Sequence, residues 1–213
     1  MGEQVRDKKG RTPLHLTTFW DELDDEFSGE FKHQADYESE KKLLTKHRKD
    51  HWDVAKTLLA NKANSEARDK DGWAPIHYCV YSDIEMLKLL IEAKADINVK
   101  GHKKVTPLHL IVARRKTNSI GIGKLLIAHK ADVNAQDENE ETPFQWAYEW
   151  GTQDFAELLL ENGADPNSKD QSGKTILRRL IENYERIQPE IKDELKDLYQ
   201  SRIDFLRKHG AHE

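Results

Sequence analysis

The sequence contains a single cysteine, Cys79, among its 213 residues. One cysteine cannot form a disulfide within the chain, so a disulfide-stapled fold is excluded and a reducing compartment is favoured. No apolar run approaches the roughly 18 residues that a membrane-spanning helix needs. We therefore expect a cytoplasmic protein that does not enter a membrane, with the host cytosol as the alternative location if it is a delivered effector.

Signatures of catalysis and cofactor binding are also lacking. The chain contains no P-loop, dinucleotide-binding, nucleophile-elbow or zinc-protease motif. Its net charge of −5 gives no general attraction to nucleic acid or to anionic membrane. We expect no catalytic residue, no metal, no cofactor and no nucleic-acid partner. An enzyme without a recognisable motif is a rival that a deep pocket lined with convergent polar groups would favour.

An internal repeat is what the sequence does contain. Similar segments begin at five positions separated by 62, 32, 36 and 33 residues, namely Thr12, Ala74, Thr106, Thr142 and Thr175. The first three read Thr/Ala-Pro-Leu/Ile-His, the fourth reads Thr-Pro-Phe-Gln, and the fifth lacks both Pro and His. A second set of similar segments, of the form Gly/Lys-Ala-Asp/Asn, lies near the end of each repeat at residues 62–66, 94–98, 130–134 and 163–167. A fixed period of this length is typical of stacked repeat architectures.

The fourth repeat shows the structural unit most clearly. Thr142 suits the N-cap of a helix, and Pro143 suits its first position, where a missing N–H has no cost. Apolar spacing predicts a short helix that ends at Gly151 and a second helix that ends at Gly163. Turn-forming residues fill positions 164–173 before the pattern restarts. The unit is therefore a helical hairpin followed by a turn.

A period near 33 residues, with T-P-L-H opening the first helix and G-A-D-x-N closing the second, resembles the ankyrin repeat. The resemblance implies an all-α ankyrin-repeat solenoid of helix-turn-helix units with β-turn tips, in which each His bonds backbone around the turn. We expect a single domain over residues 1–213. Its repeats are 7–68 with an insertion at 18–52, then 69–100, 101–136, 137–169, and 170–213 with an additional C-terminal capping helix.

The insertion in the first repeat has a polarised charge. Residues 21–30 carry six acidic side chains and no basic one, whereas the stretch from Lys41 to Lys49 is basic. Apolar residues at three- and four-residue spacing predict one long helix from about Asp36 to Ala60. This helical insertion either covers the end of the repeat stack or forms a second interaction surface, since long loops are uncommon without a use.

Lysine replaces glycine at three of the repeat-closing positions. Lys62, Lys94 and Lys130 stand where Gly163 and Gly210 stand. This position, just beyond a helix, commonly requires a left-handed backbone. We expect positive φ at all three lysines, with a strain of about 1 kcal/mol at each.

The resemblance also implies where a partner would bind. Ankyrin repeats most often meet their partners with the turn tips and the exposed side of the first helices, which form a concave face. Carrying these positions over selects the partner-binding candidates Arg11, Phe19, Trp20, Trp73, Tyr81, Lys103, Arg114, Glu141, Trp146 and Trp150. We expect a protein–protein interaction module, an adaptor, scaffold or inhibitor, that is a monomer unless bound. The alternative is a regulatory, inhibitory or secreted effector protein that acts through the charged insertion of the first repeat.

Overall fold

A computed structural model describes residues 6–18, 50–80, 84–114, 119–150, 153–187 and 193–212. Every regular element within these ranges is a helix, so the all-α fold class is confirmed. The chain divides into two compact units, Met1–His102 and Lys103–Glu213. The repeat boundaries and the single domain inferred from the sequence stay predictions.

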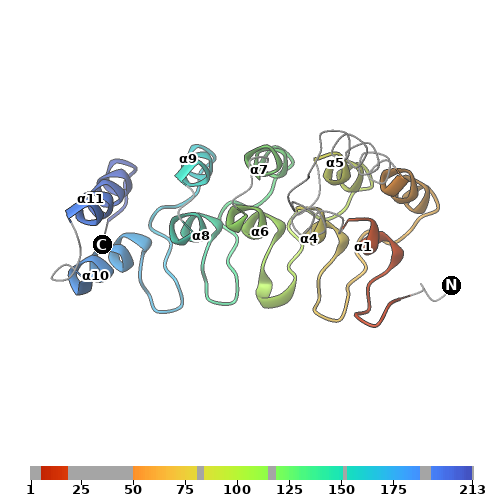
Figure 1. Ribbon diagram of the computed structural model, residues 1–213, viewed down its shortest axis with the longest axis horizontal. Helices are drawn as coiled ribbons and strands as arrows, with labels where there is room; N and C mark the ends of the chain where they lie inside the picture. Colours follow the sequence, from red (N-terminus) through yellow and green to blue (C-terminus); the bar gives the residue numbers. More distant parts are fainter. Residues whose placement is uncertain are drawn as a thin grey trace, which may run out of the picture. The chain divides into compact units, whose positions relative to one another are not determined.

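The first unit contains two helical hairpins (Figure 1). Helices α1 (Pro13–Thr17) and α4 (Pro75–Cys79) are the first helices of their repeats, and they are followed by the helix over residues 50–60 and by α5 (Ile84–Glu92). The helix over residues 50–60 is the described part of the predicted helix 36–60. The rest of that helix and the acidic stretch 21–30 lie outside the described residues. The core of this unit consists of small and branched apolar side chains, among them Leu14, Ala55, Ile76, Leu87 and Leu90.

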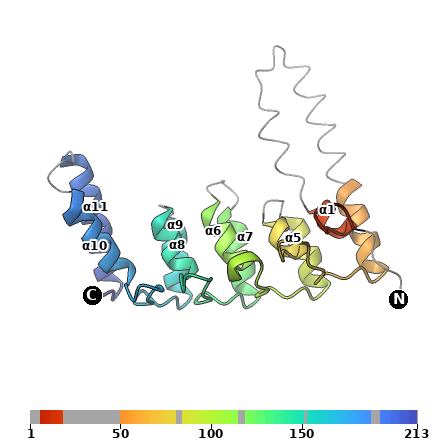
Figure 2. The ribbon, with the colours of Figure 1, turned by 90° about the horizontal axis from the view of Figure 1, so that it is seen from below.

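The second unit contains three hairpins in two layers. The first helices α6 (Pro107–Ala113), α8 (Pro143–Glu149) and α10 (Ile176–Ile187) form one layer. The second helices α7 (Ser119–Ala128), α9 (Gln153–Glu161) and α11 (Asp193–Lys208) form the other. Both layers are visible in Figure 1, and Figure 2 shows α10 and α11 running alongside each other. The last hairpin is the longest of the three, with 12 and 16 residues in its helices against 7 and 9 in α8 and α9.

The predicted starts of the first helices are confirmed. Thr106 and Thr142 are N-caps with extended backbones, and each is followed by proline at the first helical position. Their hydroxyl oxygens accept from the N–H groups of His109 and Gln145 at 3.5 and 3.4 Å. Thr175 caps α10 in the same way, because its Oγ1 accepts from the N–H of Arg178 at 3.2 Å. The local chemistry of Thr-Pro therefore sets where these helices begin.

The left-handed backbone expected at the repeat-closing lysines is also confirmed. The φ angles are 61° at Lys62, 61° at Lys94 and 72° at Lys130, close to the 87° at Gly163. Three further non-glycine residues have positive φ, namely Lys103, Lys104 and Glu140, and none of them was predicted from the sequence. Lys104 and Glu140 stand at the tip position that Gly10, Gly72 and Gly173 occupy in the other repeats, so aligning the tips would have found these two.

Asparagine side chains join successive closing turns in the second unit. Asn134 donates from Nδ2 to the carbonyl of Gly163 at 3.0 Å, and its Oδ1 accepts from the N–H of Asp165 at 2.8 Å. Asn167 makes the same pair of bonds to Gly210 and His212, at 3.1 and 2.8 Å. These paired bonds hold the closing turn of one repeat against that of the next.

Glycine in place of lysine at a closing turn should stabilise the protein. Lys94→Gly removes the steric cost of φ near 61° and should raise the free energy of unfolding by about 1 kcal/mol, or the melting temperature by about 2–4 °C. Thermal unfolding followed by circular dichroism measures the shift. The reverse substitution Gly163→Lys, at φ of 87°, should lower the melting temperature. A fall for Lys94→Gly would show that entropy gained by the unfolded chain outweighs the strain.

Candidate functional site

An aspartate holds each of three turn tips in one conformation. Oδ1 of Asp69 accepts from the N–H groups of Asp71 and Trp73, both at 2.9 Å. Oδ1 of Asp137 accepts from those of Asn139 and Glu141 at 2.8 and 3.0 Å. Asp170 does the same for Ser172 and Lys174, at 2.9 and 3.0 Å. These three carboxylates are nearly buried, so each tip is a rigid platform.

The second carboxylate oxygen of each tip aspartate reaches a side chain on the following first helix. Tyr78 donates its hydroxyl to Oδ2 of Asp69, and the indole Nε1–H of Trp146 donates to Oδ2 of Asp137 at 3.2 Å. Both donors stand four residues after the N-cap, a position that faces the tip. The aspartate therefore fixes the orientation of the ring that lies on the exposed side of the helix.

The same position holds Arg179 in the last repeat. Its Nη1 lies 3.5 Å from Oδ2 of Asp170, and it also forms an ion pair with Glu141 and a longer one with Glu149 at 3.4 Å. The sequence analysis missed Arg179, although its place four residues after Thr175 matches that of Trp146 after Thr142. Burial alone would raise the pKa of Asp170, but hydrogen bonds from Ser172 and Lys174 and the charge of Arg179 together hold it below its usual range.

Histidines of the Pro-Leu/Ile-His segments connect each first helix to the next tip. Nδ1 of His15 accepts from the N–H of Thr12 at 3.1 Å, so Nε2 carries the proton and donates to the carbonyl of Trp73 at 3.0 Å. His109 accepts from the N–H of Thr106 at 3.3 Å and donates to the carbonyl of Glu141 at 3.1 Å. The bonding around the turn implied by the family resemblance is confirmed. Two site candidates, Trp73 and Glu141, are thus held at their backbones by histidine.

Glutamine takes over this role in the fourth repeat. Oε1 of Gln145 accepts from the N–H of Thr142 at 2.8 Å, and Nε2 donates to the carbonyl of Ser168 at 3.0 Å. The amide thus places an acceptor and a donor where neutral imidazole has Nδ1 and Nε2–H. Imidazolium could not do so, because both of its nitrogens are donors.

Two of the candidates in the first unit are described. Arg11 forms an ion pair with Asp7, with Nη2 and Oδ2 2.7 Å apart. The half-buried Trp73 ring meets the His77 ring edge-on, with centroids 4.9 Å apart. A Cβ at Gly101 would collide with the Trp73 ring, so glycine is required there. The remaining candidates of this unit, Phe19, Trp20 and Tyr81, lie outside the described residues.

The candidates in the second unit fall into two groups. At the tips, the exposed Lys103 forms an ion pair with Glu138 at 2.7 Å. On the first helices, Arg114 and Trp150 occupy equivalent C-cap positions of α6 and α8. Trp150 is 47% exposed and follows Trp146 by one helical turn, so both indoles lie on one side of α8. The Trp146 ring also meets the His109 ring edge-on at 5.1 Å.

Two other kinds of feature are absent from the part of the chain that the structure describes. None of the helices there is both long and apolar enough to span a bilayer. The same residues contain no group of three or more histidine, cysteine or acidic side chains placed to hold a metal ion.

Protonation of His15 should destabilise the folded protein. Burial lowers the pKa of His15 below its usual 6.5, so between these two pKa values the unfolded chain binds more protons than the folded one. Stability is therefore fully present above pH 6.5 and falls as the pH drops below it. His15→Gln, which reproduces the bonds of Gln145, should reduce the loss of stability between about pH 7.5 and pH 5. Urea unfolding at both pH values measures this difference.

The exposed His129 is the matched control for this substitution. His129→Gln measures what the loss of an exposed histidine alone does to the pH dependence of stability, and the effect of His15→Gln is compared with it. An unchanged pH dependence in His15→Gln would show that the folded protein tolerates imidazolium at this position.

Comparison with known proteins places this architecture in a family. Residues 32–101 and 99–170 match the family model for ankyrin repeats in three copies. The chain is also similar to a putative ankyrin repeat protein of fowlpox virus (strain NVSL), with 42% identity over 59 residues, which is 26% of this chain and 12% of that relative. Ankyrin repeats generally mediate protein–protein interaction, and proteins of this family are typically non-enzymatic interaction modules. The chain belongs to the ankyrin-repeat family.

Proposed function

We propose that this chain recognises a partner protein through its turn tips and the exposed side of its first helices. The observation that carries the proposal is the pair of indoles on α8. Trp146 is oriented by its bond to Asp137, and Trp150 is 47% exposed one turn further along. Tryptophan is enriched among the residues that dominate binding energy at interfaces, so this pair is a suitable anchor for a partner.

Preorganisation strengthens this proposal. Association costs free energy for each flexible side chain that it immobilises, and this cost is smaller for a side chain that is already held. The tip aspartate, the histidine or glutamine bond and the N-cap fix the backbone and the Trp146 ring before a partner arrives. The face is therefore rigid where it carries its largest aromatic groups.

The turn tips present different charges to a partner, and the third tip, with the exposed Lys103 and Lys104 of the second unit, is basic like those of the first unit. Exposed lysines dominate the tips of the first unit, namely Lys8, Lys9, Lys70 and Lys100. In the second unit the exposed Glu138 and Glu140 lie on the fourth tip, and three carboxylates surround the single guanidinium of Arg179. Opposite charges on a partner would raise the association rate and select its orientation at each unit.

We place the role among adaptors, scaffolds and inhibitors that act in the cytoplasm as monomers until they bind. Cys79 is buried and takes part in no disulfide, which suits a reducing compartment. A second candidate function, regulation or effector activity through the charged insertion of the first repeat, depends on residues 21–30, which hold six acidic residues and no basic one. That stretch would bind a basic segment of the partner.

Affinity capture from a cell lysate with quantitative mass spectrometry tests the first-helix face. The exposed Trp150 and the half-buried Arg114 are suited to substitution, because neither lies in the buried core. Trp150→Ala with Arg114→Ala should reduce capture of specific proteins by at least about tenfold, since truncating an aromatic anchor commonly costs more than 1–2 kcal/mol. Circular dichroism and the melting temperature confirm that the variant is folded.

The matched control is a charge-neutral change on another surface. Val54, on the helix over residues 50–60, is 50% exposed, and Val54→Ala should leave capture unchanged. Deletion of residues 21–34 separates the two candidate functions. If capture survives the double substitution on α6 and α8 but is lost on this deletion, the insertion is the working surface and the first-helix face is not.

A further inference from the structure

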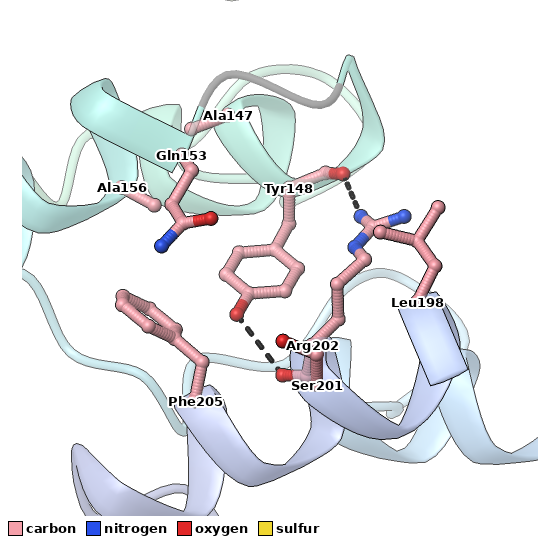
Figure 3. A pocket seen from close by; sticks show the side chains of 8 residues that line it. All are labelled: Ala147, Tyr148, Gln153, Ala156, Leu198, Ser201, Arg202 and Phe205. Carbon is pink, nitrogen blue, oxygen red and sulfur yellow. Dashed lines mark hydrogen bonds between the residues drawn. The ribbon is translucent and has the colours of Figure 1, made fainter. Parts of the chain in front are cut away.

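A pocket opens between the fourth hairpin and the last helix of the second unit (Figure 3). Its volume is about 280 Å³, and its walls come from α8, α9 and α11. Ala147 and Ala156 are fully buried beneath it, so a ligand does not reach them. The lining side chains that a ligand can reach are the exposed Gln153, Leu198 and Ser201 and the half-buried Arg202 and Phe205.

Arginine stands in this pocket at a position that other repeats fill with a core residue. The residue eight positions before the closing turn is buried and apolar in the second, third and fourth repeats, as Met86, Ile122 and Phe155. Arg202 stands eight residues before Gly210, at the equivalent position. An apolar side chain meets the needs of packing there, and arginine is almost never buried unless it is paired. The guanidinium therefore points to a role other than packing.

The partners of this guanidinium are neutral. Its Nη2 donates to the carbonyl of Tyr148, and its Cζ lies over the Tyr148 ring, 5.2 Å from the centroid. In the part of the chain that the structure describes, Arg202 has no carboxylate partner, whereas Arg11, Arg178 and Arg179 each pair with one. A guanidinium has five N–H donors, more than one carbonyl accepts. Arg202 thus keeps its charge and further donors for a ligand.

The Tyr148 hydroxyl does not compete for these donors. Burial raises the pKa of Tyr148, so its hydroxyl stays protonated and donates to the carbonyl of Arg202 at 3.1 Å. Figure 3 shows this bond, with the guanidinium and Leu198 on one side of the Tyr148 ring and Gln153 and Phe205 on the other. The tyrosine therefore holds α11 against α8 and leaves the cation to the pocket.

Two further polar groups at the pocket are available to a ligand. Gln153 donates from Nε2 to Glu157 at 3.1 Å, which leaves its Oε1 as an acceptor, and Figure 3 shows this oxygen on the side of the Tyr148 ring. The exposed hydroxyl of Ser201 forms no hydrogen bond with the residues that the structure describes. The pocket therefore presents a cation, a hydroxyl and an amide oxygen around the apolar side chains of Leu198 and Phe205.

This set of groups matches the last residue of a polypeptide. A guanidinium fits a carboxylate through parallel N–H···O bonds, and an amide oxygen accepts from a peptide N–H. A C-terminal residue carries a carboxylate, an N–H and a side chain on one Cα atom. Sites for small-molecule ligands usually measure roughly 300–1,000 Å³, so a pocket of about 280 Å³ suits a single residue.

The charges around the mouth are nearly balanced. Arg202 is the one charged residue among those that line the pocket. Over residues 153–161 and 195–208 the net charge is −1, from Asp154, Glu157, Glu161, Asp197 and Asp204 against Lys196, Arg202, Arg207 and Lys208. Exposed charges more than about 8 Å apart are largely screened at physiological ionic strength. Recognition of a carboxylate therefore depends on Arg202, and the nearby Glu157, whose charge also raises the pKa of Tyr148, opposes it.

We propose that this pocket binds the C-terminal residue of a partner polypeptide that ends in an apolar amino acid. The carboxylate of that residue accepts from Arg202 and Ser201, and its N–H donates to Oε1 of Gln153. A side chain of about the size of leucine lies against Leu198 and Phe205. This pocket is separate from the turn tips, so the chain has a second place to engage proteins.

A nuclear magnetic resonance titration of the intact chain with N-acetyl-leucine tests the proposal. The probe should cause saturable shifts of the amides of Gln153, Leu198, Ser201 and Arg202. Three controls each lack one group: N-acetyl-leucinamide lacks the carboxylate, N-acetyl-alanine lacks the larger side chain, and 4-methylpentanoate lacks the amide N–H. Each should bind at least about fivefold more weakly, because each loses about 1 kcal/mol or more of contact.

Substitutions with matched controls identify the site. Arg202→Gln removes the cation and should weaken binding of N-acetyl-leucine by at least about tenfold, whereas Arg207→Gln, at an exposed arginine of α11 outside the pocket, should not. Leu198→Ser should also weaken binding. Its control is Leu195→Ser, because Leu195 is 46% exposed against 52% for Leu198 and does not line the pocket. Circular dichroism reports whether each variant is folded.

Glu157→Gln separates recognition of the charge from a structural effect. This substitution keeps an acceptor for Gln153 but removes the neighbouring negative charge. It should tighten binding of N-acetyl-leucine and leave binding of the neutral N-acetyl-leucinamide unchanged. A general disturbance of the pocket would weaken both.

Several outcomes would overturn the proposal. Absence of saturable shifts at millimolar N-acetyl-leucine, shifts confined to other surfaces, or equal binding of N-acetyl-leucinamide would each do so. Equal binding of 4-methylpentanoate would show a site for free acids and not for a peptide terminus. Undiminished binding by folded Arg202→Gln would show that the cation is not used. If Arg202→Gln does not fold, equal binding by Leu198→Ser and Leu195→Ser would overturn the proposal instead.

Discussion

The structure depends on the hydrogen bonds that one side chain makes at the start of each first helix. His15, His109 and Gln145 each accept from the N–H of their own N-cap residue. His15 and His109 donate to a carbonyl of the following repeat, and Gln145 donates to the carbonyl of Ser168 at the end of its own repeat. Buried backbone groups need such partners, because a missing one costs about 1–3 kcal/mol. One side chain therefore completes its own helix start and joins it to the next repeat, without a core shared by distant parts of the chain.

The tip aspartates extend this local order to the candidate binding surface. Asp137 bonds the backbone of its own tip through one oxygen and the indole of Trp146 through the other. A surface aromatic group that belongs to such a network is already oriented for contact. In the last repeat, Arg179 occupies the position of Trp146, four residues after the N-cap, and lies near Asp170. The residue at this position can therefore be aromatic or charged. Variation at this position changes the chemistry of the face while the backbone that supports it stays the same.

The second unit shows how a repeat architecture produces a pocket. The Phe155 ring covers Gly123, whereas Arg202, at the equivalent position of the next repeat, turns to the carbonyl of Tyr148 and lines the pocket with it. An arginine near the C-terminal end of α8 interacts favourably with the carbonyl groups there. Helices α10 and α11 contain more residues than α8 and α9. Leu198 of α11, which is 52% exposed, is one of the residues that line the pocket.

The sequence by itself determined the features that depend on neighbouring residues. The starts of α6, α8 and α10 and the positive φ of Lys62, Lys94 and Lys130 follow from caps, turns and backbone sterics within a few positions. The roles of His15 and His109 were implied by the resemblance to the ankyrin repeat. Only the tertiary structure decided that Trp146 bonds Asp137, that Arg179 forms ion pairs with Glu141, Glu149 and Asp170, and that Arg202 bonds the carbonyl of Tyr148. The physical reason is that a long side chain such as arginine can reach several partners, and small differences in packing and electrostatic free energy decide which of them it contacts. Those partners lie up to 54 residues away in sequence, as Tyr148 does from Arg202, and no local pattern shows which of them is met.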